Sequence, residues 1–154
     1  LDTESIRERE FMPTYFENKI SGEHSEYAEE YPLLCMSWRN PYRVHMTHFM
    51  KDWAHDVMHE PVLFINPDDA AKYGIEDGSY LKASNWLGHC VMKAAYHPGM
   101  RPGSTCYYKG LAETETKSGS LGSLTTDYVD PYAVNCSFFD NRIKVEPWDG
   151  VVEE

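Results

Sequence analysis

The distribution of apolar residues predicts several short strands. The first candidate is the apolar run YPLLCMSW at residues 31–38, which a following Asn-Pro pair ends. A second candidate is EPVLFI at residues 60–65. Residues 75–108 have the pattern strand, turn, strand, turn, strand, and NRIKVEP at residues 141–147 is a final strand candidate. Six or seven short strands are typical of a β-barrel, an architecture that hides its sheet edges.

The strongest local signal predicts a two-turn helix at residues 66–74, NPDDAAKYG. Asn66 suits the N-cap, and Pro67 suits the first helical position. The two aspartates that follow suit the positive end of the helix dipole. Gly74 suits the left-handed residue that ends a helix.

A second helix is predicted at residues 45–59, HMTHFMKDWAHDVMH, which hold four of the seven histidines. At about 100° per residue the segment separates into an apolar and a polar face, so we predict an amphipathic helix that ends before Pro61. The apolar face holds Met46, Phe49, Met50, Trp53 and Val57. The polar face holds His48, Asp52, His55 and His59.

The histidines of this polar face do not match a single metal centre. His48 and His59 would lie about 16 Å apart along a helix that rises about 1.5 Å per residue. Zinc needs ligand atoms at about 2 Å, and the segment has no HExxH pattern to supply a general base. We therefore predict a solvated polar face. The alternative is a small metallohydrolase, which would carry stoichiometric zinc.

Composition limits the class of protein. A chain of 154 residues suits one domain with a core, and its net charge of -11 argues against nucleic acid or anionic lipid as a non-specific partner. No run of eighteen apolar residues predicts a membrane span. Because the chain begins at Leu1 and not Met, we expect a processed or cut chain. Any signal that selects the cytoplasm or the periplasm would then lie upstream.

Three further segments and the cysteines complete the prediction. Residues 1–30 read as an acidic arm or linker, residues 111–123 as a mobile polar loop, and residues 148–154 as an acidic tail. No GxGxxG, GxxxxGK[ST] or GxSxG pattern occurs, so the residues alone show no self-sufficient catalytic set. The cysteines are far apart and form no CxxC pair, which predicts half-buried thiols in strands: Cys35, Cys90, Cys106 and Cys136.

The order of motifs over residues 31–147 carries a family resemblance. A strand ending in Ser-Trp-Arg precedes a His/Thr loop, followed by PVLFINPDDAAKYGIEDGSYLKASNWLGHCVMKAAYHPGMRPGSTCYYKG and then LTTDYVDP. A similar series, with a TGR turn, a His-containing loop, INPEDAAKLGIKDGDWV, IRPG and a late LT…DP, marks the C-terminal domain of the molybdopterin oxidoreductases. The chain thus resembles that domain of the dimethyl sulfoxide reductase family.

The resemblance implies a mainly β fold, a six-stranded double-psi β-barrel with short helical insertions. It also implies a bis(molybdopterin guanine dinucleotide) cofactor that carries molybdenum or tungsten, with the barrel holding the guanine dinucleotide part. The metal's protein ligand and any iron–sulfur domain would belong to other domains or subunits of an oxidoreductase of anaerobic metabolism. The domain would then not be catalytic on its own. Some relatives carry out hydration or hydroxyl transfer, so the reaction type stays open.

The cofactor-binding residues that the resemblance implies fall at four places. They are the TGR-like turn, the loop after it, the end of the third barrel strand and the late motif, in which Asp130 and Pro131 also match. Arg39 and Lys109 would offset pyrophosphate charge. His45 and His48 would donate to a phosphate or a pterin carbonyl. The implied residues are Ser37, Trp38, Arg39, His45, Thr47, His48, Tyr108, Lys109, Gly110, Leu124 and Thr125.

The chain departs from the family pattern at several of these places. Trp38 stands where glycine is usual, and Tyr108 stands where histidine is common. These departures bear on individual contacts. The alternative function is a cofactor-free double-psi barrel that acts as a protein-interaction module, which the acidic arm would suit. The two hypotheses differ in geometry: a cofactor site brings Arg39, His45 and Lys109 to one concave wall, whereas an interaction module scatters them.

Overall fold

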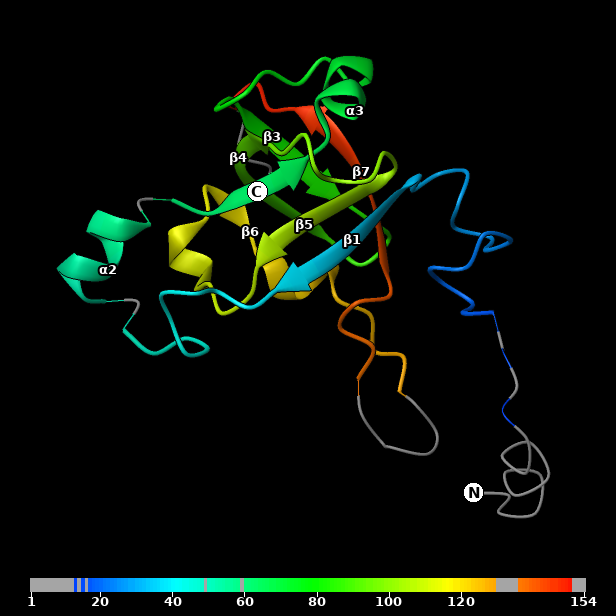
Figure 1. The fold of residues 1–154 in the computed structure, drawn as a ribbon, viewed down its shortest axis with the longest axis horizontal. Coiled ribbons are helices and arrows are strands. Elements are labelled where there is room, and N and C mark those ends of the chain that lie inside the picture. Colours follow the sequence, from blue (N-terminus) through cyan, green and yellow to red (C-terminus); the bar gives the residue numbers. More distant parts are fainter. Residues whose placement is uncertain are drawn as a thin grey trace.

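The structure, a computed structural model, describes residues 13, 15, 17–48, 50–58, 60–129 and 136–150 (Figure 1). Its strands form one sheet in the order β2-β5-β1-β7-β3-β4-β6, and an additional β2–β4 pairing closes the sheet on itself. The strands are β1 (Leu33–Trp38), β2 (Val62–Ile65), β3 (Tyr80–Ser84), β4 (His89–Tyr96), β5 (Ser104–Tyr108), β6 (Ser118–Gly119) and β7 (Asn141–Pro147). The helices are α2 (Asp52–Val57), α3 (Pro67–Lys72) and the 3-10 turns η1 (Glu113–Glu115) and η2 (Leu121–Leu124).

Six strands close the barrel, and β6 is added at the side of β4. β1 pairs with β5 and β2 pairs with β4 in parallel, while the remaining pairings are antiparallel. Closure leaves none of the six strands with an unpaired edge. The structure confirms the predicted mainly β, six-stranded double-psi barrel with short helical insertions, and it has the strands where the apolar runs predicted them.

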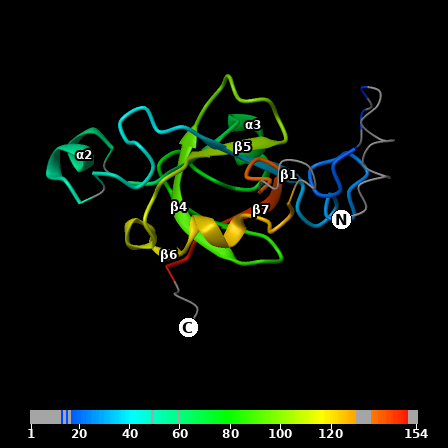
Figure 2. The ribbon, with the colours of Figure 1, turned by 90° about the horizontal axis from the view of Figure 1, so that it is seen from below.

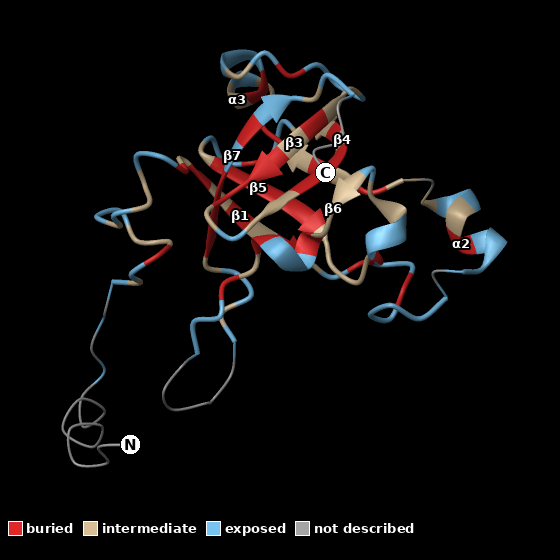
Figure 3. Ribbon diagram, turned by 180° about the vertical axis from the view of Figure 1, so that it is seen from behind, coloured by how far each residue is buried: buried red, intermediate tan, exposed pale blue. Residues whose placement is uncertain are grey.

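The core lies inside the barrel, where every second residue of most strands is buried (Figure 3). Leu33, Leu63, Leu81 and Ile143 are at most 1% exposed. Three of the four cysteines belong to the strands and are fully buried, and burial raises the pKa of each thiol to about 12: Cys35, Cys90 and Cys106. They therefore stay protonated thiols at neutral pH. Cys136 is exposed and belongs to none of the strands, so the prediction of four half-buried thiols in strands was wrong: three thiols are fully buried and one is exposed.

The predicted helix at residues 66–74 is confirmed as α3. The Asn66 side chain accepts a hydrogen bond from the backbone N–H of Asp68 and caps the helix. Gly74 has a φ of 68°, the left-handed value that ends a helix. The Asp69 carboxylate accepts a bond of 2.6 Å from the N–H of Gly103, which ties α3 to the turn before β5.

The second helix differs from the prediction. α2 begins only at Asp52, and Ala54 is its one buried residue among those described. His45 and His48 have φ values of 53° and 68°, which no right-handed helix accommodates. The described residues of the predicted apolar face are largely exposed, Met50 to 78%, and both ribbon views show α2 apart from the barrel (Figures 1 and 2). Phe49 and His59 lie outside the described residues.

The predicted mobile loop at residues 111–123 is also corrected. It contains η1, β6 and the start of η2, and β6 pairs with β4 through Cys90 and Val91. Leu121 and Leu124 are buried in the core. The sequence did not predict these core positions, because the surrounding residues are polar and glycine-rich. The two leucines are three residues apart and are not part of a longer periodic pattern.

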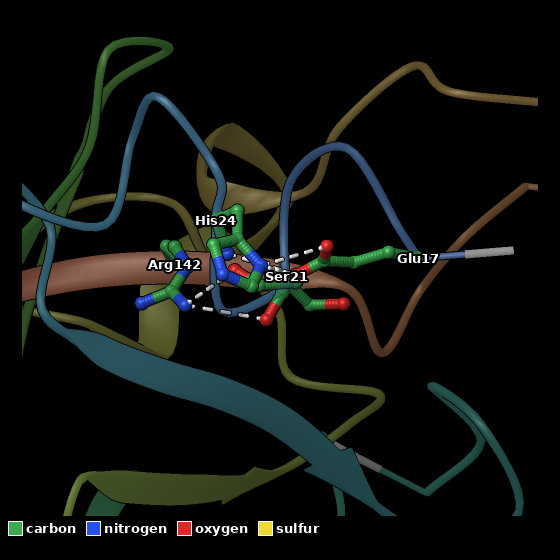
Figure 4. Close-up of polar contacts among 5 residues, drawn as sticks. Glu17, Ser21, His24 and Arg142 are labelled. Carbon is green, nitrogen blue, oxygen red and sulfur yellow. Dashed lines mark hydrogen bonds and ion pairs between the residues drawn. The ribbon is translucent and has the colours of Figure 1, made fainter.

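Residues 17–32, which include the last part of the acidic arm, lie against the barrel. Arg142 of β7 donates hydrogen bonds to backbone carbonyls at both ends of this segment, and Figure 4 shows its contact with Ser21. Tyr27 stacks on Trp86 with ring centroids 4.0 Å apart. Structure therefore begins before the first predicted strand, although the domain boundary at residue 31 stays a prediction. Among the described residues, no helix has the length and apolar content needed to cross a bilayer.

Candidate functional site

A cavity of about 300 Å³ lies where β1 and β5 end, next to η2. Strand register explains its inner wall, because Ser37 of β1 pairs with Tyr107 of β5 and both side chains are buried. The lining residues come from five segments of the chain: Ser37, His45, Met46, Tyr107, Lys109, Gly110, Leu111, Leu121, Gly122, Thr125 and Phe138.

The floor of the cavity carries neutral hydroxyl groups. Burial raises the pKa of Tyr107 well above its usual range, and Thr125 supplies a side-chain hydrogen bond. The phenol therefore stays protonated at neutral pH. Together with the hydroxyl of Ser37, these groups can donate or accept hydrogen bonds to a polar ligand.

The rim of the cavity depends on a close backbone contact between Gly110 and His45. Gly110 has a φ of 85°, and a Cβ at this position would lie 2.3 Å from the carbonyl oxygen of His45. No other residue type fits without displacing the chain. His45 itself has a φ of 53°, an uncommon value that often marks functional positions.

The charge of the described lining favours an anion. Lys109 and His45 are the residues of this lining that can carry a positive charge, and the lining contains no aspartate or glutamate. The backbone N–H of Lys109 donates to the carbonyl of Trp38 at 2.9 Å, which continues the β1–β5 pairing up to the rim. The backbone of Lys109 is therefore held directly after the end of β5.

A buried ion pair holds two sides of the rim together. Arg43 Nη1 donates to Glu115 Oε1 at 2.7 Å, with the side chains 0% and 8% exposed. Glu115 Oε2 also accepts from the backbone N–H of Ala112 at 2.8 Å. Arg43 precedes His45 by two residues, and Ala112 follows Gly110 by two residues. The pair therefore fixes the loop of His45 against the segment after β5.

Five of the implied cofactor-binding residues line this cavity: Ser37, His45, Lys109, Gly110 and Thr125. A cofactor site was predicted to bring Arg39, His45 and Lys109 to one wall. His45 and Lys109 both line the cavity, whereas Arg39 is exposed and does not line it.

The other implied residues lie elsewhere. Trp38 and Tyr108 point to the opposite side of their strands from Ser37 and Tyr107 and pack on Phe64, with ring centroids 5.6 and 5.1 Å away. The reason is strand alternation, which sends neighbouring residues to opposite faces.

The remaining three have local structural contacts. Thr47 is exposed and donates its hydroxyl proton to the carbonyl of Val44. The exposed His48 ring lies 5.4 Å from the ring of Trp53, and Leu124 is a core residue. Asp130 and Pro131 lie outside the described residues.

Six further residues line the cavity that the sequence motifs did not indicate: Met46, Tyr107, Leu111, Leu121, Gly122 and Phe138. Alternation along β5 would have paired Tyr107 with Ser37, had the register been known. Nothing local marks Leu121 or Phe138, because tertiary folding brings them to the cavity.

The polar face of α2 shows no metal centre within the described part of the chain. No three residues of the types His, Cys, Asp and Glu lie together there in a way that could hold a metal ion. His59, a member of that predicted face, lies outside the described residues.

Comparison with known proteins gives a family and a fold. Residues 33–142 match the family model described as the molydopterin dinucleotide binding domain. One relative, from Halobacterium salinarum, is named as a dimethyl sulfoxide reductase catalytic subunit. It is 32% identical to this chain over 119 residues, which are 77% of this chain and 14% of that protein. The molybdopterin-containing subunit of the Chrysiogenes arsenatis arsenate respiratory reductase is 31% identical over 117 residues, 70% of this chain and 13% of that protein.

A solved structure supports the same fold. Acetylene hydratase from Pelobacter acetylenicus superposes with a TM-score of 0.79 at 18% identity, over 94% of this chain and 23% of that chain. At this identity the likeness shows the fold alone. The chain spans less than a quarter of the length of each of these three proteins.

Proposed function

Because the chain belongs to the family of molybdopterin dinucleotide-binding domains, we propose that its cavity at the ends of β1 and β5 holds part of the cofactor of a larger molybdenum or tungsten enzyme. The cofactor of this family is molybdopterin guanine dinucleotide. When bound, it supplies the metal at which the chemistry of such an enzyme takes place. The residues of this chain bind and orient it.

The residues present fit an anionic, oxygen-rich ligand. The described lining combines one lysine, one histidine and several hydroxyl groups, and it contains no carboxylate that would repel a phosphate. Gly110 lets the backbone approach closely where a side chain would collide with His45. A cavity of about 300 Å³ is at the small end of ligand sites, so it holds a portion of a dinucleotide.

Each side chain then has a distinct role. Lys109 offsets negative charge, and the ring of His45 donates to a phosphate or carbonyl oxygen. Ser37 and Thr125 complete the hydrogen bonds from the barrel side. The single observation that carries this proposal is the convergence of His45, Lys109 and Gly110, from two separate segments, on a cavity without acidic groups.

The chain would work within a larger enzyme. It spans less than a quarter of the length of each relative described above, so most of each relative lies outside the part that matches this chain. The names of those relatives include two reductases and a hydratase, so the proposal leaves the reaction of this protein's enzyme open. We propose that the remaining domains or subunits supply the protein ligand to the metal and the substrate site.

The test uses the complete product of the gene that encodes this chain, purified without oxygen. Molybdenum, tungsten and acid-released guanine nucleotide are measured per chain, and the measurement is repeated after deletion of residues 31–147. We expect both metal and nucleotide in the intact protein and a loss of both on deletion. A full-length protein with neither would refute the proposal.

Point variants test the cavity itself. Because one hydrogen bond to a charged group is worth about 1.5–3 kcal/mol, Lys109→Met should lower nucleotide retention by about tenfold or more. Lys72→Met is the matched control, because Lys72 is an exposed residue of α3 outside the cavity. Equal retention in both variants would remove Lys109 from the proposed site.

A further inference from the structure

The backbone of His45 has a conformation that residues other than glycine seldom adopt. Its φ of 53° lies in the left-handed region. Such a conformation persists where the surrounding structure holds it in place. Because His45 lines the proposed cofactor cavity, the contacts that hold its backbone also decide where its ring stands.

One of these contacts is the close approach of Gly110 to the His45 carbonyl. A Cβ at Gly110 would lie 2.3 Å from the carbonyl oxygen of His45, so the two backbones are packed directly on each other. A packing contact resists approach strongly but resists separation only weakly. Gly110 therefore keeps the loop that contains His45 from moving towards β5, but it does not keep the loop from moving away.

The ion pair between Arg43 and Glu115 opposes the outward movement. Arg43 lies two residues before His45, and its Nη1 donates to Glu115 Oε1 at 2.7 Å. The two side chains are 0% and 8% exposed, so water does not compete for this contact. Separating the pair would leave a buried charge without a partner, which is strongly unfavourable. The pair therefore supplies the attraction that the Gly110 contact lacks.

Glu115 is itself anchored to the barrel. Its Oε2 accepts from the N–H of Ala112 at 2.8 Å, and its own N–H donates to the Ala112 carbonyl at 3.0 Å. The hydroxyl of the next residue, Thr116, donates to the carbonyl of Gly119 at 2.7 Å. Gly119 belongs to β6, which pairs with β4. The carboxylate is thus fixed from the barrel wall, independently of the His45 loop.

The position of Arg43 depends on this one carboxylate. Arg43 is 3% exposed, and its Nε and Nη2 atoms have no hydrogen-bond partner within the described part of the chain. A guanidinium has five N–H donors and is usually held by several acceptors. Glu115 therefore sets where Arg43 lies, and through Arg43 it sets where the His45 loop lies.

We propose that Glu115 is a positioning residue of the cofactor site, which acts through Arg43 on the backbone of His45. The proposal rests on the proposed function, because it takes His45 as a ligand-binding residue of the cavity. It adds a residue that none of the sequence motifs contains and that lies outside the lining of the cavity. When the pair is broken, the His45 loop moves away from Gly110 and the ring leaves the rim.

The test measures acid-released guanine nucleotide per chain in the complete gene product, purified without oxygen and separated from misfolded protein by gel filtration. Glu115→Gln keeps the volume of the side chain but removes its charge, and it should lower the retained nucleotide about tenfold. Glu113→Gln, at an exposed position of the same 3-10 turn, is the matched control and should leave retention unchanged.

A double-mutant cycle separates positioning from a general loss of structure. His45→Asn removes the imidazole ring, and asparagine tolerates a positive φ. If Glu115 acts through His45, adding Glu115→Gln to His45→Asn should lower retention no further, within about twofold. Added to Lys109→Met, the same change should give losses that multiply, because β1 and not Arg43 holds the Lys109 backbone. Losses that multiply in both combinations would overturn the proposal.

Replacement of Arg43 gives an independent reading. Because Arg43 uses a single nitrogen in the ion pair, Arg43→Lys can keep that contact. Arg43→Met keeps an extended side chain but has no charge. The lysine variant should therefore retain severalfold more nucleotide than the methionine variant. Equal losses in the two variants would contradict the proposal, since the charge pair would then have no part in retention.

The native protein distinguishes failure of this inference from failure of the proposed function. If the native protein holds metal and guanine nucleotide and Glu115→Gln retains both in full, this inference fails while the proposed function stands. If the native protein holds neither, the proposed function fails and this inference fails with it.

Discussion

Two buried arginines fasten two segments to the barrel, and they do so in different ways. Arg142 of β7 holds the arm at residues 17–32 through five backbone carbonyls, those of Ile20, Ser21, Gly22, Tyr31 and Pro32. The second segment is the excursion between β1 and β2, residues 39–61, which contains α2. Arg43 holds it through one carboxylate, that of Glu115. Every nitrogen of the Arg142 guanidinium has an acceptor, whereas two nitrogens of Arg43 have none within the described residues.

The difference separates a completed attachment from an incomplete one. The carbonyls around Arg142 satisfy the hydrogen bonds of the guanidinium without a second charge. Burial lowers the pKa of this side chain from its ordinary, very high value. The arm is therefore an integral part of the domain. The excursion leaves two buried Arg43 donors without an acceptor among the described residues, and it exposes large apolar side chains such as Met50 and Trp53.

Breaking the Arg43–Glu115 pair should have the largest effect. Glu115→Ala leaves the buried guanidinium without a partner and should lower the free energy of unfolding by about 3–5 kcal/mol. Urea denaturation of the 154-residue chain measures the change. Glu113→Ala, at an exposed position of the same 3-10 turn, is the control and should stay within about 0.5 kcal/mol. Equal stability of the two variants would show that the pair does not fix the excursion.

Removing the other arginine should have a somewhat smaller effect. Arg142→Ala deprives five carbonyls of their donor, but the arm can detach and regain water, which limits the loss to about 2–3 kcal/mol. Hydrogen exchange should rise at the N–H groups of Gly22 and Tyr31, which donate within the arm. The exposed Arg101→Ala is the control. Unchanged exchange in the arm would contradict the role of Arg142.

The contact between Gly110 and His45 gives a third way to disturb the excursion. Gly110→Ala should cost about 2–3 kcal/mol, because the new methyl group meets the His45 carbonyl as well as carrying the strain of a positive φ. Gly74→Ala has a similar φ with nothing within 4 Å, so it should cost only about 1 kcal/mol. Thermal unfolding of both variants isolates the collision from the strain. Equal losses of stability in the two variants would mean that the His45 backbone moves away from the new methyl group at little cost.

The weakest expected effect is a pH dependence of the arm, centred on Glu17 and His24 (Figure 4). The His24 backbone N–H and ring hold the pKa of Glu17 below its ordinary 4.5, and the Glu17 carboxylate holds the pKa of His24 above its ordinary 6.5. The Glu17 contribution is complete above pH 4.5 and is lost as the pH falls through the lowered pKa. The His24 contribution is complete below pH 6.5 and is lost as the pH rises through the raised pKa.

The contact is therefore complete between pH 4.5 and 6.5. A nuclear magnetic resonance titration of the His24 ring measures its pKa. Glu17→Gln should return that pKa towards 6.5, while Glu29→Gln, a control in the same arm, should leave it in place. Identical His24 titrations in the native chain and in Glu17→Gln would show that the pair does not form in solution.

The elements whose signals are local could be predicted from the amino-acid sequence. Asn66, Pro67 and Gly74 define α3 because capping and positive-φ preferences act within a few residues. The apolar runs predicted β1 through β5 and β7, and the motif order predicted the family and its barrel. His45, Lys109 and Gly110 were assigned to a site by the motifs that contain them, and the structure places all three at one cavity.

Closure of the barrel selects which face of a strand meets the cavity and which segments close that cavity. Alternation predicts that Ser37 and Trp38 point to opposite sides, but the barrel register selects the inner one. Arg142 meets an arm more than a hundred residues earlier in the chain, and Leu121 enters the core from a polar loop. Such contacts join distant segments through packing and hydrogen bonding, which no short window of sequence contains.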